Sequence, residues 1–177
     1  MKTKKIELYI HIPFCKSKCR YCDFCSFQAE NAVIDDYITK LKEELIFWGK
    51  KLTKEEVVTV FIGGGTPSYL KEQYIKEICN VIFQYFKVSE NAEITIEANP
   101  GTVDLKKLCK YRESGINRIS FGLKSTIKEE LQYLGRIHTY EQFLQCYNWA
   151  REAGFCNISV DLMSAIPKQT IHSYEKN

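Results

Sequence analysis

Three cysteines stand close together near the N-terminus, at Cys15, Cys19 and Cys22, in a C-x3-C-x2-C spacing. Thiolates are iron ligands, and three of them can hold three irons of a [4Fe–4S] cluster while the fourth iron stays open to a substrate or cofactor. Interleaved basic residues, Lys16, Lys18 and Arg20, would offset the thiolate charge and lower the thiol pKa values. The spacing therefore predicts an iron–sulfur site with one open iron.

Two other interpretations of these cysteines stay open on spacing alone. Cys25 follows closely and could complete a tetrahedral structural zinc site. It could equally be the fourth ligand of a closed cluster that only transfers electrons. Four further cysteines stand singly in apolar segments and are predicted to be small core residues: Cys79, Cys109, Cys146 and Cys156. This distribution favours a reducing, cytoplasmic location over a disulfide framework.

A second chemical feature is the glycine run Gly63, Gly64 and Gly65, followed by Thr66 and Pro67. Glycines let the backbone approach a ligand closely, and exposed carbonyls there could bind an amine. The alternative is a plain tight turn.

Alternating strand and helix patterns position these motifs. Because strands that alternate with helices form a parallel sheet covered by helices, we predict an α/β fold, a partial (β/α) TIM-like barrel of about five βα units. Each proline follows a predicted strand, so the polar motifs fall at the carboxyl ends, where parallel α/β folds build active sites. The predicted strands are residues 7–13, 57–62, 93–97, 118–123 and 157–162, and the predicted helices are residues 34–48, 70–86, 104–114, 127–134 and 140–153.

Bulk properties exclude several classes of protein. The 177 residues are enough for one domain, and the net charge of +3 comes without a basic stripe, so we expect no nucleic-acid partner. No apolar run approaches the ~20 residues of a transmembrane helix. The aromatic pair Phe47 and Trp48 is predicted to lie in the core.

The cysteine motif directly after the first strand, together with the glycine run after the second, resembles the radical SAM superfamily. Within it, several stretches resemble the oxygen-independent coproporphyrinogen III oxidase family, in sequential order along nearly the whole chain. The resemblance implies a [4Fe–4S] cluster that reductively cleaves S-adenosylmethionine (SAM). Since five units do not close a barrel, we expect residues 1–177 to be a radical SAM core without its last strands and C-terminal domain. The stretches are residues 9–15, 21–24, 63–68, 97–100, 135–138, 153–155 and 157–162.

The resemblance also implies a set of SAM contacts. Tyr9 and Tyr21 would wall the site, Gly65 and Thr66 would contact the methionine moiety, and Glu97 would accept hydrogen bonds from the ribose. Arg136 would pair with the carboxylate of SAM, and Asp161 would close the far side. Lys124 departs from the pattern, because the family usually has glutamine there, and lysine cannot accept a hydrogen bond.

The branch of the family is indicated by Phe24. The oxidases proper carry a fourth cysteine at that place, whereas Cys22, Phe24 and Ser26 here resemble the branch of the heme chaperone HemW. That resemblance implies binding of heme and its delivery to an acceptor protein. Porphyrinogen oxidation is the alternative, with an electron donor such as flavodoxin or ferredoxin, and an inactive fragment is a third interpretation. Whether the chain is an enzyme is not decided by these residues.

Overall fold

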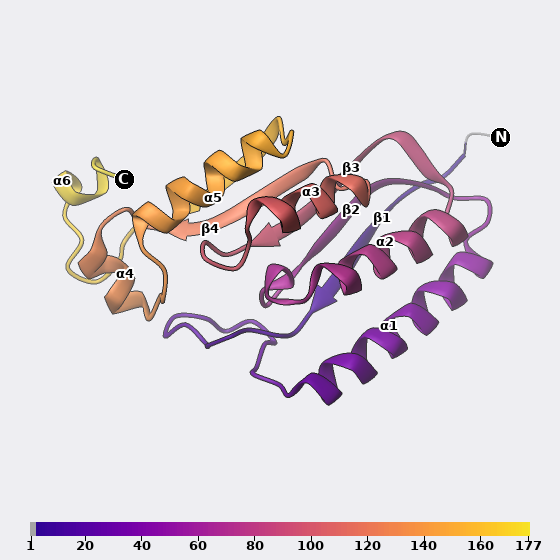
Figure 1. Ribbon diagram of the computed structural model, residues 1–177, viewed down its shortest axis with the longest axis horizontal. Coiled ribbons are helices and arrows are strands. Elements are labelled where there is room, and N and C mark those ends of the chain that lie inside the picture. Colours follow the sequence, from indigo (N-terminus) through magenta and orange to yellow (C-terminus); the bar gives the residue numbers. More distant parts are fainter. Residues whose placement is uncertain (1–2) are drawn as a thin grey trace.

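The computed structural model describes residues 3–177 and shows one parallel sheet of five strands in the order β1-β2-β3-β4-β5 (Figure 1). The strands are β1 (Lys5–Ile12), β2 (Glu56–Gly64), β3 (Val88–Ala98), β4 (Arg118–Lys124) and β5 (Asn157–Leu162). The helices are α1 (Asn31–Lys51), η1 (Pro67–Tyr69), α2 (Glu72–Tyr85), α3 (Leu105–Glu113), α4 (Lys128–Leu134), α5 (Tyr140–Glu152) and α6 (Ile171–Tyr174). The predicted α/β fold with five parallel strands is confirmed.

Four helices form a layer over the sheet. α1 contacts α2, α2 contacts α3, and α3 contacts α5, so the helices follow the strand order (Figure 1). Parallel neighbours require such crossovers, because a tight hairpin cannot join two parallel strands. The carboxyl ends of all five strands consequently meet at one edge of the sheet.

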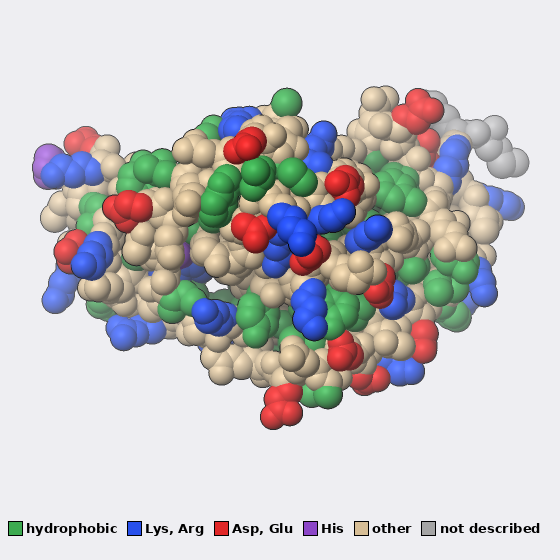
Figure 2. All heavy atoms as spheres, viewed as in Figure 1, with side chains coloured by type: hydrophobic (Ala, Val, Ile, Leu, Met, Phe, Trp, Pro, Cys, Tyr) green, Lys and Arg blue, Asp and Glu red, His purple; other side chains and the backbone are tan. Residues whose placement is uncertain are grey.

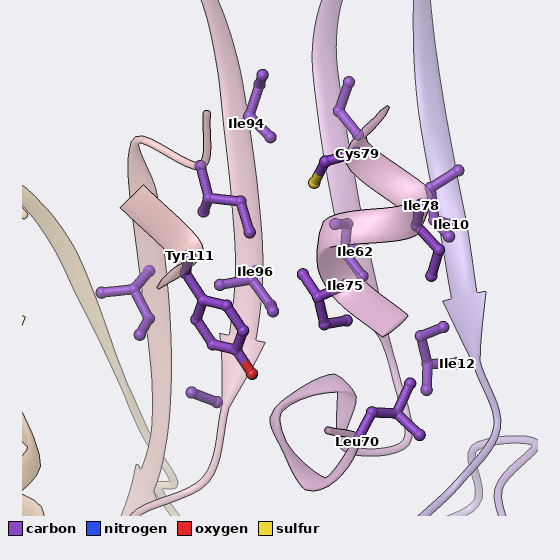
Figure 3. Close-up of a cluster of buried hydrophobic side chains, with 14 of the residues drawn as sticks. Ile10, Ile12, Ile62, Leu70, Ile75, Ile78, Cys79, Ile94, Ile96 and Tyr111 are labelled. Atoms are coloured by element: carbon purple, nitrogen blue, oxygen red, sulfur yellow. The ribbon is translucent and has the colours of Figure 1, made fainter. Parts of the chain in front are cut away.

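The core lies between the sheet and the helices. Alternate residues of each strand point into it, as a strand's side-chain period of two requires. Figure 3 shows Ile10 and Ile12 of β1, Ile62 of β2 and Ile96 of β3 around the buried face of α2. This packing holds the strands, and therefore the loops at their carboxyl ends, in fixed relative positions.

The intervening strand residues carry the polar groups. Glu97 of β3 lies opposite Ser120 of β4, and Ser120 lies opposite Ser159 of β5, so these positions share the other face of the sheet. On the outer surface seen in Figure 2, basic and acidic side chains are interspersed. Within residues 3–177, no helix is long and apolar enough to cross a membrane.

Some sequence predictions need correction. Phe47 and Trp48 are 50% and 45% exposed, because α1 turns other residues to the core, including Ile38 and Leu45. The two rings pack on each other with Lys51 beside them.

Of the four single cysteines, Cys79 and Cys146 are buried as predicted. Cys109 is only half-buried and Cys156 is exposed, since Cys156 lies in the turn between α5 and β5. β3 begins at Val88 rather than at residue 93. The register between β2 and β3 is irregular in this part, so the strand also includes the polar residues that precede Glu93.

Candidate functional site

The cysteine loop joins β1 to α1 and is fixed at its base. The backbone N–H of Cys15 donates to the carbonyl of Phe27 at 3.0 Å, and Phe27 N–H donates to Pro13 at 2.8 Å. The ring of Phe14 is buried and meets the rings of Phe27 and Tyr37 edge-on. The loop therefore leaves and rejoins the fold at one place, and its three cysteines project from a fixed base.

The glycine segment after β2 lies against this base. Gly65 N–H donates to the carbonyl of Ile12 and Thr66 N–H to that of Phe14, both at 2.8 Å. A Cβ atom at Gly65 would stand 2.8 Å from the carbonyl oxygen of Phe14 and 3.0 Å from Sγ of Cys15. Glycine is required at this position because a side chain would collide with the cysteine loop. This close approach is a more specific reason for the glycine than the plain tight turn considered from the sequence.

A cavity opens between the cysteine loop and the carboxyl ends of β2 to β5. It is lined by ten of the eleven residues predicted for the cluster and SAM sites, and Tyr9 is the one that does not line it. The ten are Cys15, Cys19, Tyr21, Cys22, Gly65, Thr66, Glu97, Lys124, Arg136 and Asp161. The structure thus brings residues from six separate chain segments to one cavity.

Tyr9 instead belongs to a chain of contacts beside the cavity. His11 Nε2 lies 2.9 Å from the carbonyl of Cys25, so that nitrogen carries the proton, and Nδ1 accepts from the Tyr9 hydroxyl at 3.1 Å. Burial and the negative charge of Glu97 raise the pKa of Tyr9. Cys25 is exposed and does not line the cavity. Cys25 therefore contacts His11 through its backbone carbonyl, and its thiol lies outside the cavity lining.

The basic residues of the loop have different roles. Lys18 lines the cavity and donates to the carbonyls of Phe24 and Ser26, at 2.9 and 3.2 Å. Arg20 points to α4, where its guanidinium reaches the carbonyl of Tyr133. The sequence predicted that Arg20 offsets the thiolate charge, but its side chain points to α4 instead.

Two carboxylates and one ammonium group face each other at the carboxyl ends of β3, β4 and β5. Burial raises the pKa of Glu97, which accepts a hydrogen bond from Gly64 N–H at 3.0 Å; the positive charge of Lys124 acts in the opposite direction. Lys124 itself forms an ion pair with Asp161. This side of the cavity can accept hydrogen bonds from hydroxyl groups, as a ribose would offer.

Arg136 brings a guanidinium group to the same cavity. It donates to Oδ1 of Asn99 at 2.6 Å, to the carbonyl of Gly122, and to Sγ of Cys19 at 3.5 Å. Its Nε is buried without a hydrogen-bond partner among the described residues. Burial raises the pKa of Tyr21 to about 12, which keeps this cavity-lining phenol neutral.

The residues present suit an iron–sulfur cluster with a bound SAM. Three cysteines line the cavity, the backbone is bare at Gly65, and a guanidinium and a carboxylate line the same space. In residues 3–177, no three His, Cys, Asp or Glu side chains are gathered as the ligands of a single metal ion. The donor set thus consists of thiols spread along a cavity wall.

The fold and this cavity define the class of protein. The model of the radical SAM superfamily matches residues 9–176, and the chain belongs to that superfamily. Solved structures agree: the chain superposes on coproporphyrinogen III oxidase (HemN) from Escherichia coli with a TM-score of 0.91 and 31% identity, covering 99% of this chain and 40% of that one.

Two kinds of curated relatives are similar to the chain, a heme chaperone and an oxidase. The chain is 39% identical over 168 residues to the heme chaperone HemW of Bacillus subtilis (strain 168), covering 94% of this chain and 44% of that protein. It is 32% identical over 173 residues to the oxygen-independent coproporphyrinogen III oxidase of Escherichia coli (strain K12), covering 97% and 38%. The chain therefore spans less than half the length of these relatives.

Sequence reasoning missed two residues that organise the site. The first is Asn99, which lies in the stretch 97–100 that carries the family resemblance and contacts both Thr66 and Arg136. The second is His11, which ties β1 to the backbone of Cys25. An amide directly after a strand that leads into the site is the signal that could have pointed to Asn99.

Proposed function

We propose that this chain is the cofactor-binding part of a heme-handling radical SAM protein, similar to the heme chaperone HemW. In this proposal Cys15, Cys19 and Cys22 hold a [4Fe–4S] cluster, and SAM binds in the cavity beside it. Residues 1–177 form the radical SAM core domain, heme is the cargo, and an acceptor protein receives it in the cytoplasm. The single observation that carries the proposal is the cavity that gathers the three cysteines with the strand-end polar residues.

Each lining residue has a task in this proposal. Gly65 and Thr66 offer backbone to the methionine moiety of SAM, and Glu97 accepts hydrogen bonds from its ribose. Arg136 attracts its carboxylate, because a guanidinium binds carboxylates with directed hydrogen bonds. Tyr9 and Tyr21 wall the site, and Lys124 and Asp161 close its far side.

The chemistry itself belongs to the cofactors. When bound, the cluster and SAM supply one-electron chemistry, and flavodoxin or ferredoxin would be suitable electron donors. The chain positions the two cofactors against each other. Its buried base, formed by Phe14 and the glycine segment, keeps that part of the site away from water.

Heme handling is favoured over porphyrinogen oxidation by Phe24. This side chain occupies the place of the oxidases' fourth cysteine, is 67% exposed and lines the cavity. The neighbouring Cys25 is displaced by one residue and lies outside the cavity lining. An exposed phenyl ring at the cavity can contact a flat apolar ligand such as heme. Similarity to the named heme chaperone of Bacillus subtilis agrees with this preference.

Oxygen-independent coproporphyrinogen III oxidation is the second candidate. The observation that favours it is the superposition on the Escherichia coli oxidase, with a TM-score of 0.91. In that case the cavity would face a propionate side chain of the substrate, and the protein would be an enzyme.

The experiment that separates the candidates uses the anaerobically reconstituted chain. Heme titration followed by absorbance should give saturable binding, and incubation with coproporphyrinogen III, SAM and a reductant should give no protoporphyrinogen. Phe24→Ala should weaken heme binding, while Phe83→Ala, an exposed phenylalanine on α2, serves as the matched control. Formation of protoporphyrinogen would overturn the chaperone proposal, and a wild-type chain without iron–sulfur absorbance would overturn both candidates.

A further inference from the structure

Asn99 is placed between two of the three cysteines of the cavity. It follows β3 directly, and its side-chain amide is half-buried. Nδ2 of Asn99 donates to Oγ1 of Thr66 at 2.9 Å, and Oδ1 accepts from Nη2 of Arg136 at 2.6 Å. Thr66 and Arg136 in turn reach the sulfur atoms of Cys15 and Cys19, at 3.4 and 3.5 Å.

These contacts form one continuous relay with a fixed direction of donation. Arg136 can only donate, so the Asn99 atom that faces it must be the carbonyl oxygen. The amide nitrogen must then face Thr66 and donate to its oxygen. This leaves the hydroxyl proton of Thr66 free to point at Cys15, and Thr66 as a residue is buried, with 5% exposure. Only a side chain with one donor end and one acceptor end satisfies both neighbours and leaves the Thr66 proton for Cys15.

The fold holds Asn99 in this position from several sides. Its backbone N–H donates to Oγ of Ser68 at 3.1 Å, and its carbonyl accepts from Oγ1 of Thr102 at 2.7 Å. A Cβ atom at Gly122 would stand 2.7 Å from Oδ1 of Asn99, so the glycine leaves room for the amide. The side chain is therefore oriented before any ligand binds.

We infer that Asn99 is a positioning residue for the iron–sulfur cluster, acting through Thr66 and Arg136 on the sulfur atoms of Cys15 and Cys19. This inference rests on the proposed cluster at those cysteines. Hydrogen bonds to cluster sulfurs raise the reduction potential, because they stabilise the extra negative charge of the reduced state. Asn99 thus helps to set the potential at which the cluster accepts an electron.

The test is the reduction potential of the reconstituted cluster without SAM, measured by anaerobic titration in a set of variants. Asn99→Asp keeps the shape but has no donor, so the Thr66 hydroxyl turns to the carboxylate, Arg136 is drawn from Cys19, and the potential shifts to a more negative value. Asn99→Ala shifts it in the same direction without adding a charge. Thr66→Val produces a smaller negative shift, and Thr66→Ser, which keeps the hydroxyl, retains the wild-type potential.

The outcomes are distinct from those of the proposed function. A wild-type chain that assembles no cluster overturns the proposed function. The relay is overturned if the wild-type chain assembles a cluster and both Asn99→Ala and Thr66→Val have the same reduction potential as the wild type. A variant that unfolds at the wild-type temperature in the metal-free state but assembles no cluster supports the relay, because the side chain of Asn99 is linked to Cys15 and Cys19 through its hydrogen bonds to Thr66 and Arg136.

Discussion

Lys124 at the end of β4 and Asp161 in β5 form an ion pair across the carboxyl ends of two neighbouring strands. The ammonium group is largely shielded, with its side chain 18% exposed, whereas that of Asp161 is 56% exposed. Lys124 adopts a left-handed backbone conformation with φ of 72°, which lysine rarely does. The fold thus tolerates local strain at a residue that faces the cavity.

The pair leads to a prediction about SAM affinity. SAM carries a sulfonium charge, which the ammonium of Lys124 repels, whereas Asp161 freed from its partner would attract it. We expect Lys124→Gln to bind SAM about threefold to tenfold more tightly, measured by anaerobic equilibrium dialysis with the reconstituted protein. Lys124→Arg keeps the charge and the pair, and should bind SAM like the wild type. Weaker binding by Lys124→Gln would contradict this account and make Lys124 a direct contact of SAM.

The close approach at Gly65 predicts a defect confined to the cluster site. Gly65→Ala places a methyl group 2.8 Å from the carbonyl oxygen of Phe14, and such overpacking costs about 1–3 kcal/mol. We expect a lower melting temperature together with loss of iron from the reconstituted protein.

The matched control for this variant is Gly154→Ala, far from the cysteine loop in sequence. Gly154 has φ of 88°, and a Cβ atom there would meet only Nε of Arg112, at an ordinary contact distance of 4.0 Å, so alanine costs about 1–2 kcal/mol through backbone strain. The control should lose stability but keep its iron. Equal iron loss in both variants would mean that general destabilisation, and not the crowding of the loop, removes the cluster.

His138 predicts a dependence of stability on pH. It is 6% exposed and donates from Nε2 to the carbonyl of Leu123, while burial and the charge of Arg136 lower its pKa to about 4. The unfolded chain binds this proton with a pKa of about 6.5, so the histidine's contribution is full above that pH and is lost as pH falls toward 4. After allowance for solvent screening, the loss is on the order of 1–2 kcal/mol.

Denaturant unfolding between pH 7 and pH 4.5 checks this prediction. His138→Gln can still donate to Leu123 but does not titrate, so its stability should fall less than that of the wild type. The exposed His172 of α6 supplies the control, and His172→Gln should follow the wild type. Parallel pH dependence of wild type and His138→Gln would refute the assignment.

The sequence predicted the fold well because strand alternation, helical spacing and proline positions are local signals. Cys15 and Gly65 could be assigned to one site for the same reason, since both follow predicted parallel strands. Their contact, however, depends on the register between β1 and β2, which no local pattern encodes. The failure at Trp48 has a similar origin: its helical spacing fits an apolar stripe, but in the last turn α1 buries Gly49 against Tyr85 and leaves Trp48 45% exposed.

Residues that act through other residues were the hardest to predict. Arg20 stands between cysteines in the sequence, yet its side chain turns to α4. Asn99 is remote from the cysteines in sequence, yet it contacts the two residues that reach their sulfur atoms. Sequence proximity misleads in the first case and is absent in the second, because both contacts are set by how the loops at the carboxyl ends of the strands pack.

The central claim is that Cys15, Cys19 and Cys22 hold a [4Fe–4S] cluster without Cys25. The most direct test is iron and sulfide analysis of anaerobically reconstituted wild type, Cys19→Ala and Cys25→Ala, with thermal unfolding as the check on folding. The account predicts about four irons and four sulfides per chain in the wild type and in Cys25→Ala, and a large loss of both in Cys19→Ala. Equal loss in the two variants would contradict it and indicate a site with four thiolate ligands.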